Sequence, residues 1–273
     1  MMSKGIDVSY HNGDIEWSLI KKQIDFAMLR CGYGKNHIDT QFYKNARSCE
    51  SLSIPFGVYW FSYALNEQMA RDEANYCCDC LTNFNILYPV AFDFEYGSEN
   101  HANKIGKTFT KNERIKIAKA FLNTVEDRGY YPILYTNEDY IVHKGFDALI
   151  NLYDVWYAQY TQNEKPKREC EIWQKGTINI GNLTKVDFNI CFKDYPSIIN
   201  PYYNVHDLDA DDINYIINES DLFYLNRDYI NLAYEIINGK YGTGTERMKK
   251  IEAMGYNYAI AQSVVNTIMH KQG

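Results

Sequence analysis

The sequence predicts an α/β protein: an incomplete TIM-like barrel of the (β/α)5(β)3 kind, followed by a small three-helix bundle. Three observations support this prediction. Short apolar runs alternate with helical patterns through residues 5–150, which is typical of a parallel sheet covered by helices. The last three apolar runs, within residues 155–188, have no helical pattern between them. Helical periodicity then returns over residues 226–269.

Eight strands are expected, and eight such strands form a closed barrel more often than an open sheet. The predicted strands are Gly5–Val8, Phe26–Arg30, Pro55–Phe61, Pro89–Phe94, Pro132–Tyr135, Val155–Gln159, Glu171–Gln174 and Val186–Phe188. The predicted helices between them are Ile15–Gln23, Thr40–Ser51, Asn66–Leu81, Thr110–Asp127 and Asn137–Ile150. Thr110 and Glu113 form a capping box at the start of one helix, and Gly129 ends it. Short polar segments, 161–168 and 175–184, should connect the last three strands.

The chain of 273 residues suits one domain of about 200 residues and a small module. We expect the barrel over residues 1–194, a linker with room for one short helix over 195–225, and a helical module over 226–273. The predicted linker carries most of the acidity, because every charged side chain from 194 to 225 is Asp or Glu. The acidity therefore belongs to the connection and not to either folded unit.

Composition narrows the class of partner. A net charge of −7 argues against nucleic acid, and no apolar run reaches the ~20 residues of a membrane helix. The N-terminus lacks the apolar core of a signal peptide. The sequence therefore predicts synthesis in the cytoplasm and release to any extracellular target by lysis or a pore. The seven cysteines cannot all pair, and their spacing suits no zinc site, so we expect free thiols, no metal and no cofactor.

Carboxylates stand at the ends of three predicted strands, where a parallel barrel places its chemistry. Asp93 and Glu95 lie two residues apart on one strand, so their side chains share a face with Cα atoms roughly 6.5–7 Å apart. Glycoside hydrolysis needs one proton-donating carboxyl and one carboxylate. Mutual repulsion and the neighbouring aromatic rings raise at least one of the two pKa values. A lone Asp-x-Glu pair is a weak signal, but Asp7 and Asp187 end two other strands and strengthen it.

An ordered set of motifs resembles the family 25 glycoside hydrolases, the Chalaropsis-type lysozymes, over residues 4–192. The motifs are Gly5-Ile6-Asp7-Val8-Ser9, Arg30-Cys31-Gly32-Tyr33-Gly34, Gly57-Val58-Tyr59-Trp60-Phe61, Phe92-Asp93-Phe94-Glu95, Leu134-Tyr135-Thr136-Asn137, Trp156-Tyr157-Ala158-Gln159-Tyr160, Trp173-Gln174 and Val186-Asp187-Phe188-Asn189. Each piece alone is unspecific, whereas the ordered set is specific. Two departures are Trp60, where many relatives carry His, and Lys175, often Tyr in relatives.

The resemblance implies hydrolysis of the β-1,4 bond between N-acetylmuramic acid and N-acetylglucosamine in bacterial peptidoglycan. It implies that Glu95 is the general acid and that Asp93 stabilises the reacting centre, with orientation of the substrate's acetamido group as one route. Asp7 and Asp187 would line the same pocket. Aromatic and amide side chains at strand ends suit a glycan groove, and the candidates are Tyr33, Tyr59, Phe61, Tyr135, Trp156 and Gln174. The alternative role for each is a place in the core or in a structural hydrogen-bond network.

The segment 228–269 resembles the short cell-wall-binding repeat of phage lysins, in a single copy. Its turn reads Gly239-Lys240-Tyr241-Gly242-Thr243-Gly244 where relatives carry Gly-Lys-Trp-Gly-Asn-Gly. The resemblance implies a muropeptide ligand, with Arg247 pairing to a peptide carboxylate and Tyr241 and Tyr258 stacking on the ligand. The alternative is a plain helical bundle whose aromatic residues form its core. Together the two units predict a phage-type endolysin.

Two other functions compete with this interpretation. A chitin hydrolase on a related barrel would carry Asp-x-x-Asp-x-Asp-x-Glu, but Val90 and Ala91 stand where further acids are expected. A wall-binding protein with a decayed site would have lost some of the four acids, and all four are present. The sequence leaves open retention against inversion at the reacting carbon, the target bacterium and the oligomeric state.

Overall fold

The computed structural model describes residues 2–199, 232–233, 235–237, 239–256, 258, 261–262 and 265. The chain divides into two compact units, residues 1–194 and 195–273. Of the predicted linker, 195–225, the structure describes only a short helix, α7 (Tyr195–Ile199). The rest of the linker and most of the first and third helices of the predicted bundle lie outside the described residues. The domain boundaries therefore stay predictions.

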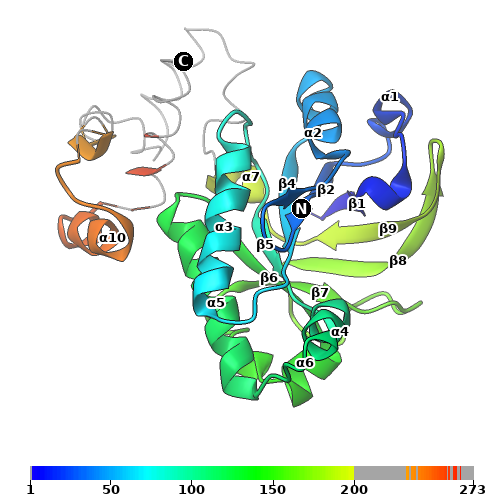
Figure 1. Cartoon of the computed structure of the whole chain (residues 1–273). Coiled ribbons are helices and arrows are strands. Elements are labelled where there is room, and N and C mark those ends of the chain that lie inside the picture. The colour runs from blue at the N-terminus through cyan, green and yellow to red at the C-terminus, as the bar shows by residue number, and fades with distance from the viewer. Residues whose placement is uncertain are drawn as a thin grey trace, which may run out of the picture. The chain divides into compact units, whose positions relative to one another are not determined.

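The first unit is built on a sheet of nine strands that closes on itself (Figure 1). The strands are β1 (Ser3–Val8), β2 (Phe26–Tyr33), β3 (His37–Ile38), β4 (Phe56–Phe61), β5 (Val90–Asp93), β6 (Pro132–Asn137), β7 (Asp154–Ala158), β8 (Ile172–Ile180) and β9 (Leu183–Cys191). Their order is β1-β9-β8-β7-β6-β5-β4-β2-β3, and pairing of β1 with β2 closes the ring. All eight predicted strands are present; β3 is a two-residue addition that pairs antiparallel with β2.

The direction of the last strand differs from a fully parallel barrel. Apart from the short β3, the pairs among β1 to β8 are parallel, but β9 runs antiparallel to both β8 and β1. The predicted polar connection over 175–184 is wrong: its first part continues β8, and a tight turn at Gly181 and Asn182 leads into β9. Gly181 adopts a φ of 57°, which glycine reaches without strain. Alternating Ile178, Ile180 and Leu183 provide the apolar face of this hairpin.

Helices cover the outside of the ring, with α3 and α5 packed side by side (Figure 1). The helices are α1 (Trp17–Ile20), α2 (Phe42–Ser51), α3 (Glu67–Leu81), α4 (Tyr96–Lys104), α5 (Lys111–Asp127) and α6 (Glu138–His143), with 3-10 turns η1 (Tyr10–Asn12) and η2 (Phe146–Ala148). The predicted capping box is confirmed, since Glu113 N donates to Thr110 Oγ1 and Thr110 N donates to Glu113 Oε2. The sequence analysis missed α4, whose run of Gly, Ser and Asn has poor helix propensity.

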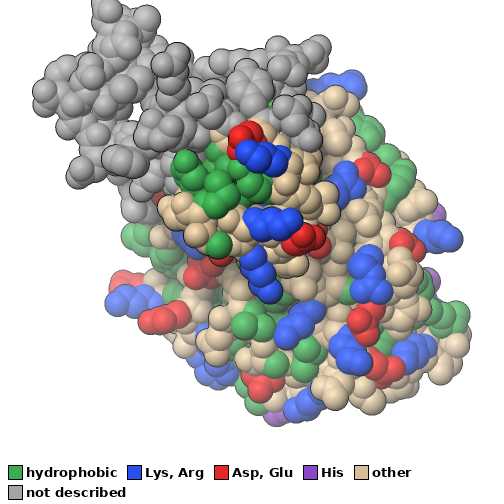
Figure 2. Space-filling model, turned by 90° about the vertical axis from the view of Figure 1, so that its left-hand side faces the viewer, with side chains coloured by type: hydrophobic (Ala, Val, Ile, Leu, Met, Phe, Trp, Pro, Cys, Tyr) green, Lys and Arg blue, Asp and Glu red, His purple; other side chains and the backbone are tan. Residues whose placement is uncertain are grey.

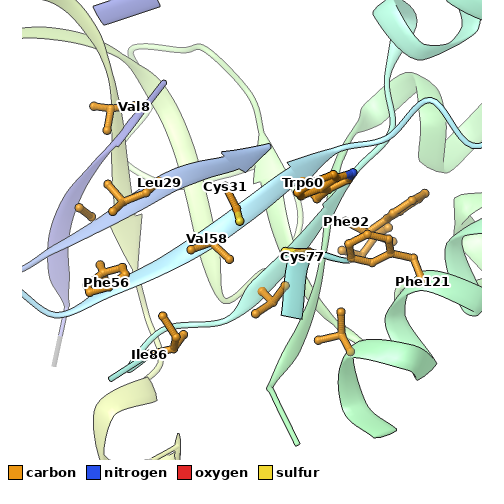
Figure 3. Packing of buried hydrophobic residues seen from close by; sticks show 14 of the residues in the cluster. Val8, Leu29, Cys31, Phe56, Val58, Trp60, Cys77, Ile86, Phe92 and Phe121 are labelled. Atoms are coloured by element: carbon orange, nitrogen blue, oxygen red, sulfur yellow. The ribbon is translucent and has the colours of Figure 1, made fainter. Parts of the chain in front are cut away.

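Side chains alternate between the two faces of the closed sheet. One set, including Leu29, Val58 and Phe92, faces the helices and joins residues such as Phe121 of α5 in the main hydrophobic core (Figure 3). The residues between them point into the barrel, and many of those near one end of the ring are polar. The outward set supplies the burial that stabilises the fold, which leaves the inward set free to carry chemistry.

The core accommodates one departure noted in the sequence, Trp60, and most of the cysteines. Trp60 is fully buried. A Cβ on Gly32, in the neighbouring strand, would lie only 2.5 Å from the Trp60 ring, so the glycine makes room for the tryptophan. Six of the seven cysteines are buried, and all seven are free thiols, as the sequence predicted. Cys31 and Cys77 belong to the same core (Figure 3).

The second unit has its own small core. Helix α10 (Gly244–Ala253) overlaps the second helix that the pattern predicts in this module, Glu246–Met254, and Gly255 follows it with a φ of 85°. The buried members of this core are Leu232, Ala233, Ile236, Tyr241, Ile251, Ala261 and Val265. Apolar residues from three predicted helices therefore meet within the described part of this unit.

The described part of one face shows no patch of a single charge. On the described part of the face in Figure 2, Lys and Arg side chains are mixed with Asp and Glu side chains. Within the described residues, no helix has the length and apolarity needed to cross a membrane.

Candidate active site

A cavity of about 320 Å³ opens at the polar end of the barrel interior. Its lining residues are Asp7, Val8, Ser9, His11, Asn12, Arg30, Tyr59, Phe61, Asp93, Glu95, Tyr135, Trp156, Gln174 and Asp187. All four predicted carboxylates and five of the six predicted substrate-contacting residues are among them. Tyr33 is not: its ring stacks on His37 instead, with centroids 5.1 Å apart. The sequence analysis missed Arg30 as a lining residue.

The Asp93–Glu95 pair sits where a strand gives way to a helix. Strand β5 ends at Asp93, and Glu95 is the N-cap of α4 with extended backbone angles, φ −137° and ψ −165°. Because the backbone stays extended across Phe94, both carboxyls face the cavity while Phe94 is buried in the core. The Ser98 hydroxyl accepts a hydrogen bond from Glu95 N at 3.2 Å, which fixes the backbone of Glu95.

Asp7 is held by a chain of buried hydrogen bonds. Its Oδ2 accepts from Gln174 Nε2 at 3.0 Å and from Asn189 Nδ2 at 2.8 Å. Gln174 in turn accepts from the Tyr135 hydroxyl at 2.9 Å, and Asn189 accepts from Trp156 Nε1 at 2.8 Å. Four residues from four other strands thus orient one carboxyl. Asn189 was not predicted as a site residue. It lies two residues after Asp187 in the motif Val186-Asp187-Phe188-Asn189, so its side chain is expected on the same face of the strand.

Asp187 reaches the cavity because β9 is antiparallel. In the register of β1 with β9, Asp187 is directly opposite Asp7, so the carboxyl lies in the middle of its strand and not at its end. The Tyr160 hydroxyl donates to Asp187 Oδ1. Tyr160 was also part of a quoted motif but was not singled out, because its position just beyond β7 gave no sign that it would fold over β9.

Burial raises the pKa of all four carboxyls in the cavity, and like charge adds to the rise for Asp7, Asp93 and Glu95. Burial, then repulsion by Asp187, raises the pKa of Asp7 to about 7. Burial, then the charges of Glu95 and Asp7, raises that of Asp93 well above its ordinary value. Burial and Asp187 raise the pKa of Glu95. Groups that interact this strongly lose protons in succession, so the cluster retains protons at a pH where isolated carboxyls are fully ionised.

Arg30 is the one Lys or Arg side chain among the described residues that line the same cavity. Arg30 Nε donates to Asp39 Oδ2 at 2.7 Å, and the guanidinium lies over the ring of Tyr10 at 4.7 Å. Asp39 also accepts from Tyr10 N and Gln41 N, which completes its hydrogen bonds. The charge of Arg30 opposes the rise in the pKa of Asp93. The arrangement therefore combines four acids with one fixed positive charge.

Aromatic rings form the remaining wall. Trp156 contacts Tyr59 and Tyr135 edge-on, with centroids 5.9 and 4.9 Å away. Burial is the main cause of the raised pKa of the Tyr59 and Tyr135 hydroxyls, so both remain neutral hydrogen-bonding groups. Rigid aromatic faces beside carboxyls suit a sugar ring, which is apolar on its faces and polar at its rim.

Comparison with known proteins agrees with this geometry. Residues 6–178 match the profile of the glycosyl hydrolases family 25. The chain belongs to glycosyl hydrolase family 25. Residues 231–269 of this family 25 protein match the CW_7 repeat.

This family 25 chain spans about half the length of two relatives that it matches at 26% identity. The lysozyme of Streptococcus phage Cp-7 is 26% identical over 223 residues, which are 80% of this chain and 57% of the relative. The autolysin LytC of Streptococcus pneumoniae superposes with a TM-score of 0.60 at 26% identity, over 70% of this chain and 47% of LytC. LytC has also been solved with a synthetic peptidoglycan ligand. The Streptomyces coelicolor lysozyme has a TM-score of 0.59 at 18% identity, covering 71% of this chain and 95% of its own, and shares the fold.

In the second unit, the three predicted wall-binding residues have different surroundings. Tyr241 is 8% exposed within the core, and its hydroxyl donates to Glu235, so its ring offers no open face for stacking. Tyr258 is partly buried against the same core. Arg247 is half-buried; its Nε donates to Gly242 O at 3.0 Å and its Nη1 to Gln262 at 3.1 Å.

The raised pKa of Asp7 predicts a cost in stability at high pH. In the unfolded chain Asp7 ionises near 3.8, whereas in the fold it keeps its proton up to about 7. The contribution of Asp7 to the free energy of unfolding is therefore fully present below pH 3.8 and is lost as the pH rises through about 7. The difference between the folded and unfolded pKa values of Asp7 corresponds to a loss of about 4 kcal/mol in the free energy of unfolding.

We therefore expect Asp7→Asn to stabilise the protein at pH 8 and to have little effect at pH 4. The gain should be on the order of 2 kcal/mol, because the substitution also loses hydrogen bonds that favour the carboxylate. Urea unfolding at both pH values measures it, with the exposed Asp147→Asn as control. An equal loss of stability at both pH values would contradict the assigned electrostatic cost.

Proposed function

We propose that the protein hydrolyses the β-1,4 bond between N-acetylmuramic acid and N-acetylglucosamine in bacterial peptidoglycan. The observation that carries the proposal is the cavity itself: Asp93 and Glu95 face it together, beside Asp7, Asp187 and a wall of aromatic rings. Two carboxyls beside a sugar-sized cavity are the minimum that glycoside hydrolysis requires. Loss of catalysis by decay is disfavoured because all four acids are in place.

In this mechanism Glu95 donates a proton to the oxygen of the leaving sugar. The acid must still hold that proton near neutral pH, and both burial and Asp187 act in that direction. Its position at the end of β5, with its backbone fixed by Ser98, keeps the carboxyl at the cavity wall. Glu95 is also the carboxyl of the pair that a substrate reaches more easily, since Asp93 is more deeply buried than Glu95.

Asp93 stabilises the positive charge that develops on the reacting sugar. Repulsion between Asp93 and Glu95 suppresses loss of the second proton, so the pair carries one proton and one negative charge over a broad pH range. The charge of Arg30 opposes the rise in the pKa of Asp93 and so favours the state in which Asp93 is the anion of the pair. The pair then supplies the acid and the anion together. Asp7 and Asp187 surround the pair and position the substrate.

The relatives support this substrate. The phage Cp-7 protein is a lysozyme, and LytC is an autolysin solved with a peptidoglycan ligand. Both are at 26% identity, and the matched family covers the barrel whose cavity carries the acids. We carry their substrate over to this chain on that basis. The glycan strand would occupy the barrel cavity, against Tyr59, Phe61, Tyr135, Trp156 and Gln174.

The second unit would hold the enzyme at the bacterial wall by binding muropeptide. The match of residues 231–269 to the CW_7 repeat supports this role. Arg247 is the best-placed ligand, because its guanidinium is half-exposed and is fixed by two hydrogen bonds. A single repeat binds weakly, and its main effect would be to raise the concentration of the barrel near its substrate.

The bond that is cut can be read from the new reducing ends. Peptidoglycan digested by the protein should yield reducing ends on muramic acid, detected by borohydride reduction and mass spectrometry. Glu95→Gln should lower the rate by roughly 100-fold or more, because it removes the proton donor. Glu164→Gln, an exposed change on the loop after β7, should leave the rate unchanged. Reducing ends on glucosamine would refute the muramidase proposal, and full activity of Glu95→Gln would refute the assigned acid.

Asp187 should set the upper pH limit of activity through its effect on Glu95. Asp187→Asn removes a negative charge that raises the pKa of Glu95, so the protonated acid should be lost at lower pH. The basic limb of the kcat/KM profile should move down by about 0.5–1 pH unit, while Asp147→Asn leaves it in place. An unchanged or higher limb in Asp187→Asn would rule out this coupling.

Wall binding can be separated from catalysis in the Glu95→Gln protein. Adding Arg247→Ala should weaken co-sedimentation with purified cell walls roughly 10-fold, because a charged hydrogen bond to the muropeptide is lost. Lys249→Ala, an exposed change on the same helix, should not weaken it. Circular dichroism verifies that each variant is folded. Undiminished binding by a folded Arg247→Ala protein would exclude Arg247 from the binding site.

A further inference from the structure

Helix α3 carries an acid within its buried face. The buried residues of α3 are Ala70, Glu73, Ala74, Cys77, Cys78, Cys80 and Leu81. Glu73 is 2% exposed. Burial and the charge of Asp72 raise its pKa to about 7, and no Lys or Arg among the described residues lowers it. A buried carboxyl without a cation weakens a fold, and an apolar side chain would suit this face better. The acid is therefore expected to serve more than stability.

Glu73 reaches the β4–α3 turn, residues 62–64, which lies between the two elements it is named after. Its Oε1 accepts a hydrogen bond from Tyr63 N at 3.1 Å, and the Ser62 side chain also hydrogen-bonds to the carboxyl. The Ser62 hydroxyl accepts from Ala64 N at 3.2 Å. Because the turn belongs to no strand or helix, these hydrogen bonds orient its backbone. Glu73 thus holds the turn from inside the helical layer.

The β4–α3 turn contacts both elements that carry the acid pair. Ser62 N donates to Asp93 O at 2.8 Å, at the end of β5. The ring of Tyr63 stacks on that of His101 in α4, with centroids 4.2 Å apart. Glu95 stands between these two elements, as the N-cap of α4 directly after β5. The turn therefore supports the strand and the helix whose junction holds the proton donor.

The same turn sets the position of a cavity residue. Phe61 ends β4 and lines the cavity, and its ring meets that of Tyr63 edge-on with centroids 5.3 Å apart. On its other side the ring packs on α4, because a Cβ on Gly97 would lie 2.9 Å from it. Displacement of the turn would therefore move a wall residue together with the two elements that carry the carboxyls.

We infer that Glu73 is a positioning residue for the reaction: through the β4–α3 turn it holds β5 and α4 in the arrangement in which Asp93 and Glu95 act on the glycan. Glu73 itself does not line the cavity. Misplacement of reacting groups by about 1 Å can cost on the order of 100-fold in rate, so loss of this support should lower kcat more than it weakens substrate binding. The inference deepens the proposed function and rests on it.

The test compares Glu73→Leu with Glu73→Gln. Leu suits the apolar face but cannot accept from Tyr63 N, whereas Gln keeps a carbonyl acceptor. Assays at pH 6 make Gln the neutral match, since a pKa of about 7 leaves Glu73 mostly protonated there. The control is Cys78→Ala, a fully buried change on the same helix whose thiol interacts instead with Arg128, the C-cap of α5.

Initial rates on soluble, peptide-free chains of alternating N-acetylmuramic acid and N-acetylglucosamine give kcat and KM. Glu73→Leu should lower kcat roughly 10-fold and change KM by less than about threefold. Glu73→Gln should restore kcat to within about threefold of the unmodified protein. Cys78→Ala should lower the midpoint of urea unfolding, because it leaves a cavity, and should keep the full kcat.

A second measurement follows the turn without any cleavage. The stacked ring of Tyr63 displaces the nuclear magnetic resonance signals of the His101 ring protons, which isotope-labelled histidine makes visible and His101→Gln identifies. These signals should move in Glu73→Leu, because the turn is released, and should stay in place in Glu73→Gln and Cys78→Ala.

A folded Glu73→Leu protein with full kcat, or with unmoved His101 signals, would overturn the inference, as would equal losses of kcat in Glu73→Leu and Glu73→Gln. If Glu73→Leu does not fold, Ser62→Ala takes its place. It removes the hydroxyl that bonds to Glu73 and should lower kcat about threefold; an unchanged kcat would overturn the inference. Absence of cleavage by the unmodified protein would instead refute the proposed function, and the His101 signals would then show by themselves whether Glu73 holds the turn.

Discussion

Strand β9 is the constraint on which the rest of the site depends. It runs antiparallel between β8 and β1, and this pairing closes the sheet into a ring. The same register sets Asp187 directly opposite Asp7. Like charges placed opposite each other on adjacent strands destabilise a sheet, so closure of the barrel and repulsion inside the cavity have one origin. The outward apolar residues of the same strands offset this cost by packing under the helices.

The cavity is built from groups that would each be unfavourable alone. Buried carboxyls, a buried guanidinium and unpartnered polar atoms all weaken the fold. They persist because the alternate residues of the same strands form a dense core with Trp60, Phe92 and the buried cysteines. Period-two alternation thus separates the two tasks within each strand. One face stabilises the barrel, and the other holds charges in positions that suit a reaction.

The sequence predicted much of this arrangement. Apolar runs and their alternation located all eight strands, and the motifs at strand ends identified the four carboxyls, which the structure brings to one cavity. The antiparallel course of β9 could not be predicted, because a single apolar run carries no information about direction. Helix α4 was missed for a related reason. Its residues have low helix propensity, and the contacts that stabilise it, such as Glu99 with Arg114 at 2.5 Å, come from another helix. Arg30 was quoted within a motif, but only the fold shows that its free edge faces the acids.

The capping position of Glu95 has a mechanical consequence. The residue is at once the last extended position after β5 and the N-cap of α4, so its carboxyl moves with both elements. Helix α4 is in turn tied to α5 through Glu99 and Arg114 and to the segment after α6 through Lys144. The proton donor is therefore braced from outside the barrel as well as from its wall. The rigidity of the acid is a property of the helical layer, and substitutions there would act on the cavity without touching the substrate.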